Sequence, residues 1–325
     1  MSYQIKILLL SFIASVVVSL VIIPILRRLK VGQIERTEGP ESHLKKQGTP
    51  TMGGIVMIIT ILAVSVFMYL QYIKTEAEVA KNLIPLVLVT IGFGIVGFVD
   101  DFKKLVLKNT DGLKPALKML GLLIIAVAFV IYLLKFMNIG TETLIPILKQ
   151  YITIPMLIYV PFAIIVMLGT TNAVNLTDGI DGLATSITTI IIACLTVIGL
   201  VQEIKEIVIL GSIICGVNLG FLLFNMHPAK VFMGDTGSLL LGGAIASMAL
   251  YSKMPLILLV IALIPVIETI SVIMQVAYFK KTGKRIFKMT PIHHHFELSG
   301  WNENKIVTVF SIATLLLCVI GLNII

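Results

Sequence analysis

The chain opens with IKILLLSFIASVVVSLVIIPILRRLK, residues 5–30, in which an apolar run of about 20 residues is followed at once by Arg27, Arg28 and Lys30. A helix of that length crosses a hydrocarbon core of about 30 Å, and only helices or closed barrels satisfy the backbone in lipid. Basic residues after the run are typical of a stop-transfer segment, whereas a cleavable signal peptide carries its charge first. We therefore predict a retained transmembrane helix with its amino end outside.

Similar apolar runs recur along the whole 325-residue chain, which is 58% hydrophobic and only 13% charged. Its mean hydropathy of +1.05 excludes a soluble protein of two domains. The sequence predicts an all-α, polytopic membrane protein with one domain over residues 1–325 and about ten spans. The predicted spans are about 5–26, 52–70, 83–99, 119–137, 154–171, 184–201, 206–224, 238–252, 254–276 and 305–324.

The 25 lysines and arginines are distributed unevenly over the predicted loops. Most of them lie in the odd-numbered loops 27–51, 100–118, 225–237 and 277–304, which the positive-inside rule places in the cytoplasm. An even number of spans then leaves both termini on the outer face. Because the basic residues lie beside spans, the net charge of +8 indicates contact with anionic lipid headgroups and not with nucleic acid.

All the aspartates and all five histidines fall in predicted cytoplasmic loops. This segregation is expected of an enzyme at the membrane–water boundary and not of a channel. Cys194, Cys215 and Cys318 lie inside apolar runs and are predicted to be packing residues. The outer connection 138–153 is predicted to form either a short helix or a hairpin at the interface.

The first candidate segment is GFVDDFKK, residues 97–104, in which Asp100 and Asp101 close a span and two lysines follow. Adjacent carboxylates raise each other's pKa unless a cation lies nearby. Taken alone, the pair is equally consistent with acidic residues solvated at the membrane interface.

The second segment is NAVNLTDGIDG, residues 172–182, which contains Asn175, Asp178 and Asp181 but no lysine. Its glycines permit tight turns. Two aspartates three residues apart would direct both carboxylates to the same point, on one helical turn or in one tight loop. A plain polar turn would hardly need so many acidic and amide side chains.

The third segment is FNMHPAKVFMGDTGS, residues 224–238, where Asp235 lies just before a predicted span. A carboxylate beside the free N–H groups of a helix start suits a cation bridged to phosphate. Phe232 could stack on a nucleobase, or it could anchor the loop in the membrane.

Two further segments contain groups that bind phosphate. In PIHHHFELSGW, residues 291–301, the side chains of neighbouring histidines diverge, so we expect phosphate or substrate contacts and not one metal site. KKQGTPTMGG, residues 45–54, combines Lys46 and Thr51 with glycines, which suits either a phosphate or a helix-entry turn. The order of a P-loop is absent.

All five segments lie on predicted loops of the same side, which is the main argument for a single site. Carboxylates without cysteine ligands point to a hard cation that prefers oxygen, and Mg²⁺ bound to substrate phosphates fits best. Nearby lysines would hold the rest of a diphosphate.

Taken in order, TPTMGG, VDD, NLTDGIDG, FNMHPAKVFMGDTGS and PIHHHFE resemble the phospho-N-acetylmuramoyl-pentapeptide-transferases, a family of the polyprenyl-phosphate N-acetylhexosamine-1-phosphate transferases. The resemblance covers essentially the whole chain. It implies a multi-pass enzyme of the bacterial plasma membrane, with its active site facing the cytoplasm. Such an enzyme combines UDP-N-acetylmuramoyl-pentapeptide with undecaprenyl phosphate, releases UMP and requires Mg²⁺. By analogy, a homodimer is expected.

The resemblance also assigns roles to residues of this chain. Asp235 would hold Mg²⁺ and act in catalysis, Asp100 would be a base or contact the lipid phosphate with Asp101 beside it, and His294 would also be catalytic. Residues expected near the nucleoside and the metal are Asn175, Asp178, Asp181 and Phe232. Residues expected to contact phosphates or the muramoyl part are Lys46, Thr51, Lys104, Lys118, Asn225, His293 and His295. The sequence leaves Lys114 and Lys118 interchangeable.

Two alternatives stay open at this point. One is a related transferase for another UDP-N-acetylhexosamine, which the PIHHHFE segment argues against. The other is a secondary transporter of nucleotide sugars or anions, whose ionisable groups would lie near the bilayer midplane. Only one carboxylate, Glu268, lies well inside a predicted span.

Overall fold

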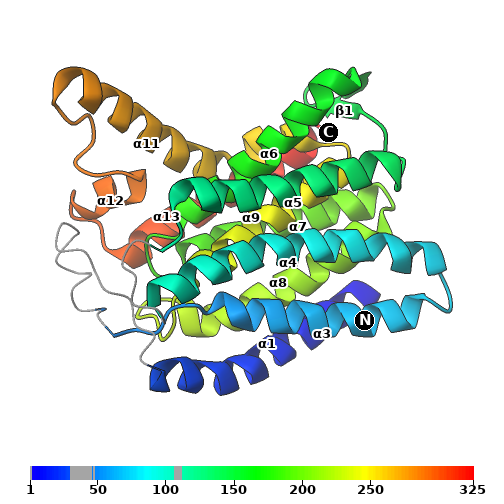
Figure 1. The fold of residues 1–325 in the computed structure, drawn as a ribbon, viewed down its shortest axis with the longest axis horizontal. Helices are drawn as coiled ribbons and strands as arrows, with labels where there is room; N and C mark the ends of the chain where they lie inside the picture. Colours follow the sequence, from blue (N-terminus) through cyan, green and yellow to red (C-terminus); the bar gives the residue numbers. More distant parts are fainter. Residues whose placement is uncertain (1, 30–45, 47, 106–111) are drawn as a thin grey trace.

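The computed structural model describes residues 2–29, 46, 48–105 and 112–325. Within these ranges nine helices are long and apolar enough to cross a membrane, which confirms the prediction of an all-α polytopic membrane protein. These helices form one bundle (Figure 1). They are α1 (Tyr3–Arg28), α3 (Gly54–Tyr72), α4 (Ala77–Leu105), α5 (Pro115–Lys135), α6 (Met156–Thr177), α7 (Leu183–Val201), α8 (Lys205–Asn225), α11 (Leu263–Thr282) and α13 (Glu303–Asn323).

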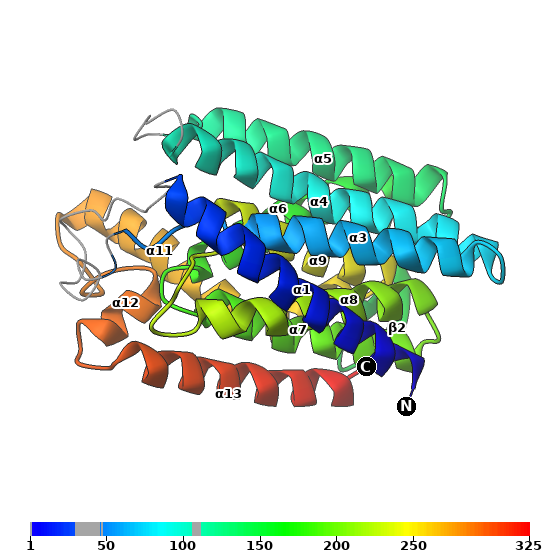
Figure 2. The same cartoon turned by 90° about the horizontal axis from the view of Figure 1, so that it is seen from below.

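The predicted span 238–252 corresponds to α9 (Gly234–Tyr251), which runs through the middle of the bundle (Figures 1 and 2). All its residues from Thr236 onwards are buried, and it packs mainly against α4 and α6. The approach is close, because a Cβ at Gly242 would lie 2.5 Å from the Cα of Thr171. Since the other helices shield α9 from lipid, it can contain more small and polar residues than they do.

Several helices extend into segments that were expected to be loops. α4 contains Asp100 and Asp101, and Asp235 lies in the first turn of α9. The three consecutive histidines lie on a short helix, α12 (Ile292–Glu297). The prediction that all aspartates and histidines lie in loops is therefore wrong. Hydropathy marks where an apolar stretch ends, whereas a helix continues while its backbone and side-chain polar groups find partners.

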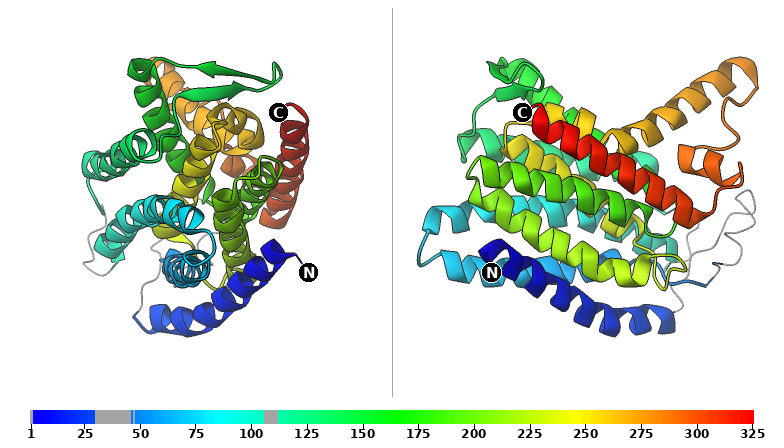
Figure 3. Two further views of the ribbon diagram at one scale, coloured as in Figure 1. Left: turned by 90° about the vertical axis from the view of Figure 1, so that its right-hand side faces the viewer. Right: turned by 180° about the vertical axis from the view of Figure 1, so that it is seen from behind.

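The predicted span 254–276 is not one helix. It is divided into η1 (Pro255–Ile257), α10 (Leu258–Ile261) and α11. The interruption lies just before Pro265, which has no N–H to donate to the preceding turn. Beyond it, α11 leans away from the bundle (Figures 1 and 3), and α12 packs against both α11 and α13.

The end of the bundle opposite α12 contains both chain termini and a β-hairpin (Figure 2). β1 (Glu142–Ile145) and β2 (Gln150–Thr153) pair antiparallel, so the connection 138–153 adopts the hairpin, one of the two predicted alternatives. The N–H of Ile147 donates to the carbonyl oxygen of Ile324 at 2.9 Å, which joins the hairpin to the carboxyl terminus. The three cysteines are buried and free, as predicted for packing residues.

Candidate active site

Four helices bring charged side chains together at the α12 end of the bundle. Asp100 and Lys104 come from the last turns of α4, Lys118 from the first turn of α5, Asn175 from the end of α6, and Asp235 from the start of α9. We call these five residues the lysine–carboxylate cluster. Helix ends meet here because the helices are antiparallel neighbours, so residues far apart in sequence share one site.

Asp235 has the most partners in this cluster. Its Oδ2 atom accepts hydrogen bonds from the Nζ atoms of Lys104 and Lys118, both at 2.9 Å. Its Oδ1 atom accepts from the Nδ2 atom of Asn175 at 2.7 Å. α4 approaches α9 closely because Gly97 has no side chain, and a Cβ there would collide with the carbonyl oxygen of Asp235. The glycine therefore allows the two carboxylate-bearing helix ends to meet.

Asp100 is buried and shares the two lysines with Asp235. Its Oδ2 atom lies 2.7 Å from the Nζ atom of Lys104 and 3.5 Å from that of Lys118. Its Oδ1 atom accepts the backbone N–H of Leu113 at 2.7 Å. Of the two interchangeable lysines, it is Lys118 that reaches the cluster, and Lys114 lies exposed before the first turn of α5.

Asp101 points toward the first turn of α9. Its carboxylate accepts the N–H groups of Asp235 at 3.2 Å and of Thr236 at 2.9 Å. It also accepts the Thr236 hydroxyl at 2.6 Å. The first N–H groups of a helix lack partners within the helix, and a carboxylate in this position satisfies them. Asp101 thus caps α9 from a neighbouring helix.

The neighbouring Asp178 lies directly after α6. Burial, together with the negative charges of Asp235, Asp101 and Asp181, raises the pKa of Asp178 to about 8. Four carboxyl groups, those of Asp100, Asp101, Asp178 and Asp235, thus lie near two lysines. Carboxylate and amide oxygens are the ligands that Mg²⁺ prefers, so the residues present fit that ion.

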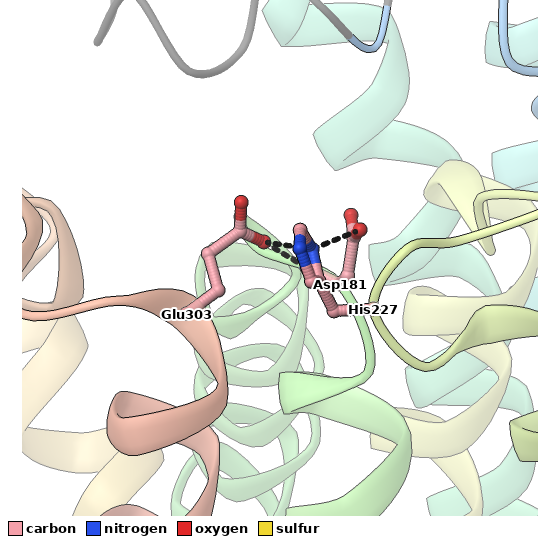
Figure 4. A group of neighbouring side chains, drawn as sticks. All are labelled: Asp181, His227 and Glu303. Carbon is pink, nitrogen blue, oxygen red and sulfur yellow. Dashed lines mark hydrogen bonds and ion pairs between the residues drawn. The ribbon is translucent and has the colours of Figure 1, made fainter.

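A second group, which we call the Lys46 cluster, consists of Lys46, Asp181, His227 and Glu303. The Lys46 ammonium lies 2.8 Å from Oδ1 of Asp181 and 2.6 Å from Oε2 of Glu303. The Nδ1 atom of His227 lies 3.0 Å from Oδ2 of Asp181 (Figure 4). Although burial alone would lower the pKa of Lys46, its hydrogen bonds to the two carboxylates raise it.

The ligand atoms of Asp181, His227 and Glu303 all lie within 4.8 Å of one another, which would suit a metal ion. The Lys46 ammonium, however, already contacts both carboxylates. Lys104 and Lys118 contact the carboxylates of the lysine–carboxylate cluster in the same way, so both groups of residues could hold a cation and both already have ammonium partners.

The three histidines of α12 point to different partners, as expected of consecutive side chains. The Nδ1 atom of His293 lies 3.1 Å from Oε2 of the buried Glu268. His294 contacts Glu297 at 2.7 Å. His295 accepts the backbone N–H of Lys288 at 3.1 Å. The three rings therefore contact three different groups of the protein.

The remaining predicted residues lie around the start of α9. Thr51 is buried on a segment that pairs with the half-buried Phe232, whose N–H donates to the carbonyl oxygen of Pro50 at 2.8 Å. Asn225, the last residue of α8, accepts a hydrogen bond from the Thr185 hydroxyl at 2.6 Å. Its amide also donates to the carbonyl oxygen of Val231 at 3.0 Å, which holds the loop after α8 in place. His43, Lys45 and Asp111, which were part of the sequence argument, lie outside the described residues.

Sequence reasoning gave no role in the site to three residues that the fold brings to this end of the bundle: His227, Glu303 and Glu268, the partner of His293. His227 lies within a quoted segment, and its position in a predicted cytoplasmic loop was the available signal. Glu303 begins α13 and has no motif around it. Only the folded chain places it beside Lys46.

Residues 83–253 match the family model described as Glycosyl transferase family 4. This match assigns the chain to the glycosyl transferases. Because its helices can cross a membrane, it is a membrane-embedded member of that class.

Full-length comparisons narrow this class. The chain is 46% identical over 322 residues to a phospho-N-acetylmuramoyl-pentapeptide-transferase of Acetivibrio thermocellus, an alignment that covers 98% of the chain and 94% of the relative. Proteins of the same name from Clostridium botulinum (48% over 314 residues, 97% and 94% covered) and Halalkalibacterium halodurans (47% over 316 residues, 97% and 95% covered) are similar. The chain belongs to the phospho-N-acetylmuramoyl-pentapeptide-transferase family, and is a multi-pass bacterial membrane protein.

Proposed function

We propose that the chain transfers phospho-N-acetylmuramoyl-pentapeptide from its UDP-linked form to undecaprenyl phosphate at the lysine–carboxylate cluster, with release of UMP. The observation that supports this site most strongly is the sharing of Lys104 and Lys118 by Asp100 and Asp235. Two ammonium groups held between two carboxylates can bind phosphate oxygens without leaving their positions. Phosphoryl transfer depends mainly on such positioning and charge neutralisation.

The reaction also calls for a cation, and Mg²⁺ is our proposal. Asp235 would hold it, together with oxygen atoms of Asn175 and Asp178. When bound, the ion would neutralise charge on the diphosphate and on the departing UMP. Release of the Asp178 proton would accompany binding, because burial and the neighbouring carboxylates raise the pKa of this carboxyl to about 8.

In the proposed step, an oxygen of the lipid phosphate forms a bond to the sugar-bearing phosphorus. The bond from that phosphorus to the bridging oxygen breaks, and its electron pair leaves with UMP. The second pKa of a phosphate ester is about 6, so the attacking oxygen is already largely deprotonated. We therefore assign Asp100 to orienting the lipid phosphate through Lys104 and Lys118, and Asp101 to holding α9 in place.

The Lys46 cluster lies beside this centre and is proposed to bind the nucleoside. Asp181 offers acceptor oxygens and Lys46 a donor, while Phe232 is half-buried and could cover a base. His294 and His295, on the side of α12 that is partly exposed, would face the muramoyl part. In this proposal residues 1–325 form one catalytic domain whose active site faces the cytoplasm, and two copies form a dimer.

The test is a reaction of the purified protein with Mg²⁺, undecaprenyl phosphate and UDP-N-acetylmuramoyl-pentapeptide. We expect UMP and the lipid-linked sugar in equal amounts. A parallel reaction with UDP-N-acetylglucosamine should give neither product. Product from UDP-N-acetylglucosamine alone would instead assign the chain to a related transferase, and UMP without a lipid product would contradict transfer.

Direct attack is tested separately by rapid quenching during turnover. Direct attack predicts that no phosphoryl group remains attached to the protein. A phosphorylated Asp100 or Asp235 in the quenched protein would replace direct attack with a covalent intermediate.

A further inference from the structure

Glu268 is a charged residue inside a membrane helix, and the reaction described above makes no use of it. It lies in the second turn of α11 and is fully buried. Acidic side chains inside membrane helices are costly to insert and commonly mark functional sites. The role of Glu268 therefore depends on the residue that its carboxylate contacts.

That partner is His293, which is also fully buried. Oε2 of Glu268 lies 3.1 Å from the His293 Nδ1 atom. The backbone N–H of His293 donates to the same oxygen at 3.4 Å. One carboxylate oxygen thus contacts both the ring and the main chain of the histidine, which fixes the first turn of α12 against α11.

The opposite edge of the His293 ring lies against Gly179. A Cβ at Gly179 would collide with the Nε2 atom of His293, so the ring occupies the space where any other residue would place its side chain. Gly179 lies between Asp178 and Asp181, one of which lies near the lysine–carboxylate cluster and the other in the Lys46 cluster. The histidine therefore connects α11 with the loop that supplies both carboxylates.

Stability alone does not account for this arrangement. Replacing a buried ion pair with apolar residues of similar volume is often neutral or stabilising. Within the described residues, moreover, both ring nitrogens of His293 and the Oε1 atom of Glu268 have no hydrogen-bond partner, so the ring and the carboxylate are in close contact while the hydrogen bond between the two residues comes from the His293 backbone. The contacts of the two side chains instead fix the position of the loop 178–181 relative to α11 and α12.

We propose that Glu268 and His293 are positioning residues: the carboxylate holds the ring against Gly179 and so sets the loop of Asp178 and Asp181 for the uridine diphosphate part of the donor. This inference rests on the proposed function and replaces the substrate contact that the resemblance implies for His293. The lipid phosphate is bound at the other side of the site, by Lys104 and Lys118, and is not affected by this contact.

The experiment compares Glu268→Ala, Glu268→Gln and Gly179→Ala with the unchanged protein. The matched control is Thr269→Val, because Thr269 is the next residue of α11 and its hydroxyl donates only to the carbonyl oxygen of Pro265, at 3.0 Å. Three quantities are measured for each: the Kd for UMP, the KM for donor and for undecaprenyl phosphate, and the midpoint of thermal unfolding.

Glu268→Ala and Gly179→Ala should each raise the Kd for UMP and the donor KM about tenfold or more, the range found when supporting contacts of a site are removed. The KM for undecaprenyl phosphate should stay within about twofold. Glu268→Gln keeps an oxygen that accepts the backbone N–H of His293 and should recover most of the binding. Thr269→Val should match the unchanged protein.

Equal increases in both KM values would overturn the inference, as would unchanged UMP binding in Gly179→Ala. If UMP binding weakens only in proportion to the fall in the midpoint of thermal unfolding, Glu268 has a purely structural role and the inference is also wrong. If Glu268→Ala does not fold, Gly179→Ala and Glu268→Gln still decide the question. UMP binding needs no turnover, so failure of this inference is distinguishable from failure of the proposed reaction.

Discussion

At the scale of single residues, the site depends on how a small number of ammonium groups offsets a larger number of buried carboxylates. Asp100 and Asp235 share two lysines, and Asp181 and Glu303 share one. Burial, together with the charges of three neighbouring carboxylates, raises the pKa of Asp178. Carboxyl groups therefore lie close to one another at the position where the proposed cation and diphosphate would bind.

The pH dependence of stability follows from Asp178. Its carboxyl has a pKa of about 8 in the folded protein and about 4 when unfolded, so the folded state binds the extra proton between these values. Stability of the metal-free protein should therefore fall as the pH rises from about 4 to about 8. Thermal unfolding measured across this range should show a smaller decline for Asp178→Asn. An equal decline in both proteins would contradict the assignment.

Removing the Lys46 charge should destabilise the protein as well as weaken UMP binding. Lys46→Met leaves two buried carboxylates, Asp181 and Glu303, without their cation, and breaking a buried pair costs about 3–5 kcal/mol. Adding Glu303→Gln should restore part of the loss. The unfolding free energy in detergent measures this, with the exposed Lys230→Met as control. Equal unfolding free energies for Lys46→Met and the control would show that the Lys46 charge does not stabilise the protein.

Much of the lysine–carboxylate cluster could be predicted from sequence, because Asp100, Lys104, Asn175 and Asp235 lie at the ends of apolar runs and inside recognisable motifs. The partners in the Lys46 cluster could not. Glu303 is separated from Lys46 by most of the chain, and no pattern in a single sequence reports which side chains of different helix ends meet. Asp101 is a further case, because its backbone partners on α9 become visible only in the fold.

At the scale of elements, the start of α9 is the part of the fold on which the site most depends. Its first turn presents Asp235 and receives the carboxylate of Asp101 from α4. Hydropathy located this helix but placed its beginning several residues late, since Gly234 to Gly237 are not apolar. The same pattern failed to show the break before Pro265, because the residues on both sides are equally apolar.

The cap formed by Asp101 can be tested by a pair of substitutions. Asp101→Ala removes the acceptor for the first N–H groups of α9 and should lower stability by about 0.5–2 kcal/mol, the usual cost of losing a helix cap. Asp101→Asn keeps an acceptor oxygen and should be much closer to the unchanged protein. Chemical unfolding of the two variants measures the difference. Equal loss in both would show that the negative charge matters and the cap does not.

At the scale of the whole molecule, the separation of the two ends of the bundle matters most. One end contains the two charged clusters and α12, and the other contains the hairpin and both termini (Figure 2). The positive-inside rule, applied to the basic residues of the predicted loops, predicts that the end with the clusters faces the cytoplasm.

Orientation is tested with single cysteines in cells, because the native cysteines are buried. Gln150→Cys on the hairpin and Lys114→Cys before α5 are both at exposed positions. A reagent that does not cross membranes should label Gln150→Cys in intact cells and Lys114→Cys only after permeabilisation. The reverse pattern would place the active site outside.

The most direct test of the central claim, that the carboxylate at the start of α9 serves the transfer reaction, is UMP release by Asp235→Asn over a series of Mg²⁺ concentrations. The control is Glu142→Gln at the opposite end of the bundle, where the carboxylate pairs with Lys253 at 2.7 Å. Loss of a group that stabilises developing charge lowers turnover by about 100-fold or more. We expect that loss for Asp235→Asn at every Mg²⁺ concentration and none for Glu142→Gln. Turnover of Asp235→Asn close to that of the control would contradict the account.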